Sequence, residues 1–154
     1  MENQKEIIIK IMEEILAKMT LAGDIEVIDE VDGARFVVKT RSANALIGNN
    51  GQNLSSFSHI IKKIAEVKLR KSGVLEPLQF SVDVNDYQLK KTDELKSLAK
   101  MNAQRVRYFK KEVVLPHMNS YERRIVHTAL AEYPDINTES VGEGEERKII
   151  IRPI

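Results

Sequence analysis

The chain has 154 residues and no cysteine, which excludes a disulfide framework and any thiolate-bound metal. Hydrophobic residues make up 42% and charged residues 31%, a balance that allows a packed core and argues against disorder. The net charge of +1 is unevenly distributed: residues 1–85 hold 11 Lys/Arg and 12 Asp/Glu (net −1), residues 86–127 hold 10 and 5 (net +5), and residues 128–154 hold 3 and 6 (net −3). The central segment is therefore where a polyanion would be attracted.

The first residues predict a helix followed by two strands. Apolar residues recur at three- and four-residue steps from residue 5 to about 21, so this segment should form an amphipathic helix that ends near Gly23. Its alternating charges are typical neither of a signal peptide nor of a membrane span, and we expect a cytoplasmic protein with no membrane span. The β-rich segments 25–28 and 35–39 flank Asp32-Gly33, a turn pair that predicts an antiparallel hairpin.

Two further helices and a third strand are predicted to complete this half. A short apolar turn at residues 45–47 is followed by Gly48-Asn49-Asn50-Gly51 and by a long helix, and residues 79–84 alternate with the period of a strand. The apolar face predicted for the long helix comprises Leu54, Phe57, Ile60, Ile61, Ile64 and Val67. The predicted order is therefore α-β-β-α-α-β, and a first domain is expected over residues 1–85.

A second domain is expected over residues 86–154, and it begins with a long basic helix. Asn85 or Asp86 can cap this helix, which should end near Lys111. Its predicted apolar anchors are Leu89, Leu95, Leu98, Val106 and Phe109.

The end of the chain predicts a second helix and two strands. Pro116 breaks the chain, and Asn119 and Glu122 then have the spacing of a capping box, so a helix should start here. Segments 136–141 and 147–152 are strand-like and flank an acidic loop. The fold class predicted for the whole chain is α+β.

The loop Gly48-Asn49-Asn50-Gly51 is the first candidate site. Its glycines allow the backbone to turn tightly and point amides outward, and the following helix adds the positive end of its dipole. Such a loop can hold a nucleic-acid phosphate, with Ile47 and Leu54 as a wall for unstacked bases and Val37 or Val38 as a further contributor. The alternative is a plain connector, because GxxG alone is a weak signal.

The run from Ala45 to Leu54, together with the predicted element order, resembles the K homology (KH) domain in its bacterial arrangement and its LIGxxGxxL signature. The resemblance covers about half of the chain. It implies that a short single strand binds in a groove beside the loop. Loops of this family often carry Arg or Lys between the glycines, whereas this loop carries Asn49 and Asn50, so its electrostatic attraction should be weaker.

Arg123 and His127 form the second candidate site, because residues four apart project from the same face of a helix. Arginine offers a planar fork for phosphate oxygens, and histidine adds a donor that can also stack on a base. Three further cations are expected to extend this surface: Arg124, Lys100 and Arg107. The alternative is that Arg123 pairs with a carboxylate and His127 is an ordinary surface or half-buried residue.

The run from Leu115 to His127, followed by Thr138-Glu139-Ser140, resembles the R-three-H domain, which is named for its Arg, three spacer residues and His. This resemblance implies a small fold of two helices and strands, and a single-stranded nucleic-acid surface at Arg123 and His127. A KH-like module followed by an R-three-H-like module resembles the bacterial Jag family of SpoIIIJ-associated, KhpB-like proteins. That family implies single-stranded RNA as the partner and a role in RNA regulation; single-stranded DNA, a KH-domain protein partner and a homodimer are open alternatives.

The sequence does not predict an enzyme. Its histidines, His59, His117 and His127, are scattered, and no Walker-type, HExxH or Ser-His-Asp pattern is present. We therefore predict no catalytic residue, no metal and no cofactor. Two alternatives stay open: a protein-interaction module with vestigial nucleic-acid binding, and a metal-independent nuclease with His127 as its acid or base.

Overall fold

The computed structural model describes residues 1–154 and divides into two compact units, Met1–Gln88 and Leu89–Ile154. Each unit has its own three-stranded sheet and its own hydrophobic core, so the α+β class is confirmed. The division falls inside a helix, after Gln88, whereas the sequence predicted a boundary after residue 85. No helix combines the length and the apolar character that crossing a membrane would require.

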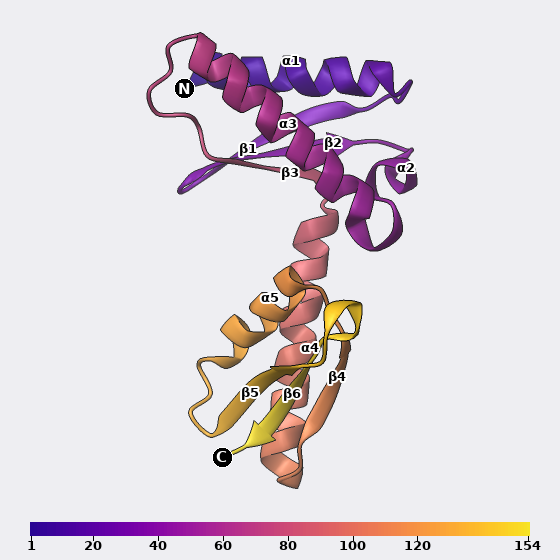
Figure 1. The fold of residues 1–154 in the computed structure, drawn as a ribbon, viewed down its shortest axis with the longest axis vertical. Helices are drawn as coiled ribbons and strands as arrows, with labels where there is room; N and C mark the ends of the chain where they lie inside the picture. The colour runs from indigo at the N-terminus through magenta and orange to yellow at the C-terminus, as the bar shows by residue number, and fades with distance from the viewer. The chain divides into compact units, whose positions relative to one another are not determined.

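The first unit has the predicted order of elements: α1 (Glu2–Lys18), β1 (Asp24–Glu30), β2 (Gly33–Lys39), α2 (Ala43–Ile47), the 3-10 turn η1 (Asn49–Gly51), α3 (Gln52–Lys71) and β3 (Phe80–Val84). Strand β2 is central, antiparallel to β1 and parallel to β3. Helices α1 and α3 lie together over one face of this sheet (Figure 1). Their apolar stripes and the inward side chains of β2 form the core.

The buried stripe of α3 is narrower than the sequence predicted. Its buried residues are Leu54, Phe57, Ile61, Ala65 and Leu69. Their three- and four-residue steps follow one line along the helix, and Ile60 and Val67 lie beside this line and are exposed. The predicted apolar face was therefore wrong for these two residues.

The hairpin turn is shifted by one residue from its prediction. Glu30 pairs with Gly33, so the turn consists of Val31 and Asp32 rather than of Asp32-Gly33. Gly33 is needed for another reason, because a Cβ at this position would lie 2.1 Å from the carbonyl oxygen of Gln79. Glycine thus allows the chain before β3 to approach the start of β2.

Charged side chains cover the face of the sheet opposite α1 and α3. Asp86 accepts a hydrogen bond from Lys39 at 2.7 Å and one from Arg35 at 3.0 Å, and these cations hold the pKa of Asp86 below its usual range. Asn85 exchanges hydrogen bonds with the backbone of Thr40. Asn85 or Asp86 was predicted to cap the next helix. The carboxylate that accepts a hydrogen bond from the Gln88 amide, in the first turn of that helix, instead belongs to Asp83.

The second unit contains α4 (Tyr87–Phe109), which begins in the first unit, followed by β4 (Val113–His117), α5 (Ser120–Leu130), β5 (Ile136–Val141), the 3-10 turn η2 (Gly144–Glu146) and β6 (Lys148–Pro153). All its strand pairs are antiparallel, in the order β4-β6-β5. The sequence did not predict β4, which contains Pro116. Proline is tolerated here because β4 is an edge strand, and its pairing with β6 is irregular between Val114 and His117.

Helices α4 and α5 pack against this sheet through a small apolar core. Its buried residues are Leu95, Ala99, Ala103, Val106, Leu115, Met118, Val126, Leu130, Ile136, Ile149 and Ile151. Leu89 and Phe109, which were predicted as anchors of α4, are instead exposed. The predicted capping box is confirmed: Asn119 accepts from the amide of Glu122, and the Glu122 carboxylate accepts from the amide of Asn119, both at 2.9 Å.

Candidate nucleic-acid interface

The loop between α2 and α3 contains three residues with positive φ angles, which residues with side chains rarely adopt. The φ angle is 70° at Gly48, 52° at Asn50 and 77° at Gly51. A Cβ at Gly48 would lie 2.5 Å from the side chain of Asn53, and one at Gly51 would lie 3.1 Å from the ring of Tyr87. The positive φ angles favour glycine at both positions, and a side chain at position 48 would also have to displace Asn53.

The loop leaves its central residues available to a ligand. The amide of Gly48 donates to the carbonyl of Asn44 at 2.9 Å, and the amide of Gly51 donates to the carbonyl of Gly48 at 3.4 Å. The amides of Asn49 and Asn50 are the two in the loop that remain for an anion, and both side chains are exposed. Asparagine suits position 50 because it is among the few non-glycine residues that adopt the left-handed conformation readily.

The predicted wall beside the loop is only partly present. Ile47 is half-buried and can contact a base from the side of the loop. Leu54, Val37 and Val38 have no exposed surface, so they cannot contact a ligand in this structure. Leu54 lies in the core beneath the start of α3, where it supports the loop. The sequence does not distinguish a groove wall from a core residue, so their burial could not be predicted, and their role as base contacts stays a prediction without support from this structure.

Arg123 is buried, although the sequence placed it on an accessible surface. Only 7% of the residue is exposed. Its Nη1 donates to the carbonyl oxygen of Met118 at 2.5 Å and its Nη2 to the hydroxyl of Ser120 at 3.1 Å. These bonds join the end of β4 to the first turn of α5. Arg123 thus holds the chain at the start of this helix, and its part in phosphate binding stays a prediction.

His127 lies one turn beyond Arg123 and is half-buried. Its Nδ1 is 2.8 Å from the hydroxyl of Thr138 on β5. Burial lowers the pKa of His127 below its ordinary value, and the positive charge of Arg123 lowers this pKa further. The imidazole is therefore neutral at pH 7, and the Thr138 contact fixes its ring.

The other predicted cations differ in how freely they could meet a phosphate. Arg107 donates to Asp135 at 2.7 Å, and its guanidinium lies 5.6 Å from the ring centre of Tyr133, so it is already engaged. Lys100 and Arg124 are exposed and form no ion pair. Of the predicted set, these two have the charge and the accessibility that a backbone contact needs.

Two exposed tyrosines lie close to these cations in the sequence and were not among the predicted site residues. Tyr121 is three residues before Arg124 on α5, so the two share a helix face. Tyr108 is near the end of α4, one residue after Arg107, and is largely exposed. Neither tyrosine belongs to the apolar stripe of its helix, and this position in the sequence could have identified both as exposed.

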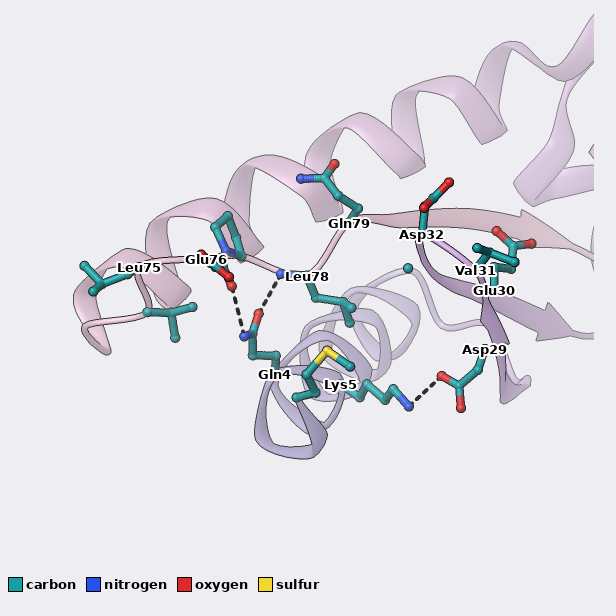
Figure 2. Close-up of a pocket in the computed structure, with 14 residues that line it drawn as sticks. Gln4, Lys5, Asp29, Glu30, Val31, Asp32, Leu75, Glu76, Leu78 and Gln79 are labelled. Atoms are coloured by element: carbon teal, nitrogen blue, oxygen red, sulfur yellow. Dashed lines mark hydrogen bonds and ion pairs between the residues drawn. The ribbon is translucent and has the colours of Figure 1, made fainter.

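A cleft of about 690 Å³ lies at the other end of the first unit, beyond the C-terminus of α3 (Figure 2). Four carboxylates line it, those of Asp29, Glu30, Asp32 and Glu76. Lys5 is the only Lys or Arg among the lining residues, and it pairs with Asp29 at 2.7 Å. The negative charge disfavours phosphate, so the cleft is not part of this interface.

The side chain of Gln4 closes one side of this cleft by bonding to the backbone on either side of Pro77, at Glu76 and Leu78. The cleft is thus bounded by α1 and by the chain that leads into β3. No group of three or more His, Asp or Glu that could hold a metal ion occurs here or elsewhere in the structure.

Residues 93–153 match the R-three-H domain, so the second unit belongs to this class of small domain. Over most of its length the chain is also similar to proteins named RNA-binding protein KhpB. It is 32% identical to the one from Clostridium symbiosum, with 93% of this chain and 63% of the relative covered, and 32% identical to the one from Bacillus subtilis, with 84% and 61% covered. The predicted resemblance to the Jag family is thereby confirmed. The chain spans less than two thirds of the length of either relative.

Proposed function

We propose that this protein binds single-stranded RNA and acts in RNA regulation. The observation that carries the proposal is a set of exposed cations without ion-pair partners on a domain that matches the R-three-H family. On and just after α4 these are Lys96, Lys100, Arg105, Lys110 and Lys111, and on α5 there is Arg124. The relatives are named RNA-binding proteins, which agrees with this choice of ligand.

The first unit is proposed to act as a KH domain. Its α-β-β-α-α-β order and its glycine-bracketed loop support this assignment. In this proposal the amides of Asn49 and Asn50 face one phosphate, and Ile47 lies beside the adjacent base. The loop has no cation of its own, so it positions the strand and contributes less attraction than the second unit.

The function is proposed to be binding rather than catalysis, in the cytoplasm. A KH-domain protein or a second copy of this chain is a proposed additional partner. His127 is the residue that a nuclease would use, and its ring is already held by Thr138.

The test is a titration of labelled single-stranded RNA, single-stranded DNA and duplex RNA at two salt concentrations. We expect the single-stranded RNA to bind most tightly, because the base edges of a duplex are hidden. Log affinity should fall linearly with log salt, because phosphate contacts release counterions. Equal affinity for duplex and single strand, or binding that salt does not weaken, would contradict the proposal. RNA cleavage without a divalent metal, abolished in His127→Ala, would instead establish a nuclease.

A further inference from the structure

The end of α4 carries two aromatic rings that the fold leaves in solvent. Tyr108 is 82% exposed and Phe109 is 62% exposed. Neither residue is among the buried or partly buried residues that form the core of the second unit. Burial of a large aromatic side chain normally stabilises a fold, so two adjacent exposed rings need another explanation.

The two rings form one preorganised unit. Their centres are 4.9 Å apart and their planes are inclined by 82°, an edge-to-face arrangement that leaves ring surface uncovered. The helix ends at Phe109, and Lys110 follows with a φ angle of 54°. The amide of Lys110 donates to the carbonyl of Val106 at 2.9 Å, which closes the helix end. The rings therefore lie at the closed end of the helix, where the chain leaves α4.

The chain around this pair is basic, and most of its cations have no ion-pair partner. From Leu95 to Lys111 the chain has six Lys or Arg and no Asp or Glu. Arg107 is the one cation of the six that has an ion-pair partner. The backbone of Lys110 is in the left-handed conformation, which glycine would adopt without strain. The presence of lysine at this position favours a use for its charge.

We propose that Tyr108 and Phe109 form a stacking platform for unpaired bases, with Arg105, Lys110 and Lys111 contacting the adjoining phosphates. The chemistry fits because a single strand exposes both base faces and backbone charge, and stacking on aromatic rings with nearby cations binds it without selecting a sequence. A neutral apolar partner would cover the rings and leave the cations without counter-charges. The platform would contact the RNA in addition to the loop and to the surface of Arg123 and His127. The choice of RNA as the ligand rests on the proposed function.

The experiment compares Tyr108→Ala and Phe109→Ala with wild type, using a single-stranded RNA oligonucleotide and an abasic strand of the same length. Each substitution should weaken binding of the oligonucleotide about fivefold or more, because one stacked base is lost. Binding of the abasic strand should be unchanged, since its phosphates remain. Leu75→Ala is the matched control, because Leu75 is an exposed apolar residue at the acidic cleft. Thermal unfolding should be the same in all variants.

A reporter variant separates failure of the platform from failure of the proposed function. The chain has no tryptophan, so Tyr108→Trp introduces a single indole fluorophore. Its emission should be quenched by the RNA oligonucleotide and not by the abasic strand. If wild type binds no single strand at all, the proposed function fails. If wild type binds but the two alanine variants bind equally well, or the tryptophan is not quenched, only the platform is excluded. A dimer of the wild type that either alanine substitution dissociates would assign the rings to a second copy of the chain and overturn the proposal.

Discussion

The two units differ in whether the residues of their sequence signatures are accessible to solvent. In the first unit, the loop glycines have positive φ angles, the amides of Asn49 and Asn50 form no backbone hydrogen bond, and both residues are exposed. In the second unit, the signature residue Arg123 is buried and bonded to Met118 and Ser120. The comparison teaches that a sequence signature can mark a residue that supports the local fold as well as one that is left accessible.

The largest effect that would test this difference is expected from Arg123→Ala. Removal of the side chain leaves the carbonyl of Met118 without its donor and empties a buried position. The free energy of unfolding should fall by about 1–3 kcal/mol, the cost of a buried hydrogen-bonding group that loses its partner. Chemical denaturation of both proteins measures this change. An unchanged midpoint and slope would mean that Arg123 has no structural part, and would leave phosphate binding as its role.

Arg124→Ala should show the opposite behaviour. Arg124 is exposed and unpaired, so the stability of the fold should not change. RNA affinity should fall to a similar extent for all sequences, and the slope of log affinity against log salt should decrease by about one unit for one lost phosphate contact. Titrations of several oligonucleotides at three salt concentrations measure both quantities. Thr128→Ala is the control, because Thr128 is exposed one turn further along α5 and is uncharged; a loss of equal size in this variant would remove the electrostatic explanation.

Substitutions of Asn49 should change RNA affinity by a smaller amount, in a direction that depends on the charge introduced. Asn49→Asp places a negative charge beside the proposed phosphate and should weaken binding, whereas Asn49→Lys should strengthen it and steepen the salt dependence. Position 49 is the cleaner choice, because a lysine at position 50 would have to adopt a φ angle of 52°. Parallel RNA titrations of the two variants provide the measurement. Wild-type affinity in both, with folding intact, would identify the loop as a connector.

The smallest expected effect is a pH dependence of stability that comes from His127. Its pKa in the folded protein lies below the ordinary value of 6.5, because of burial and of Arg123. The unfolded chain therefore takes up a proton first as the pH falls, so stability decreases below about pH 6.5 until the folded pKa is passed. Unfolding free energies at pH 8 and pH 5.5 should show this decrease, and His127→Gln should reduce it. A variant with the same pH dependence as wild type would exclude His127 as the cause.

Local signals in the sequence were sufficient for most of the fold. The helical periodicity of α1 and the reciprocal side-chain and backbone bonds of Asn119 and Glu122 depend on residues a few positions apart, so they could be predicted. Strand β4 could not, because Pro116 argues against a strand unless the strand is known to lie at an edge. The formation of β4 therefore depends on its position at the edge of the sheet and not on the local sequence pattern.

The candidate site was harder to predict than the fold. The spacing of Arg123 and His127 predicts that they share a helix face, but it does not predict which groups they contact. Those groups belong to Met118, Ser120 and Thr138, the last of which is on β5. The same limit applies to Leu54, which is apolar and beside the loop whether it is a groove wall or a core residue. Phe109 shows the converse, because an aromatic residue on a helix is usually an anchor, and here it is exposed.

Pro116 also has a consequence for the behaviour of the protein at high concentration. Open sheet edges are places where a second molecule can add a strand, and repeated addition leads to aggregation. Strand β4 forms one edge of its sheet, and Pro116 removes a backbone donor from it while its pairing with β6 is interrupted near the same residue. A neighbouring copy would find no continuous row of hydrogen-bonding groups along this edge, so the residue that obscured the strand in the sequence also protects it from intermolecular pairing.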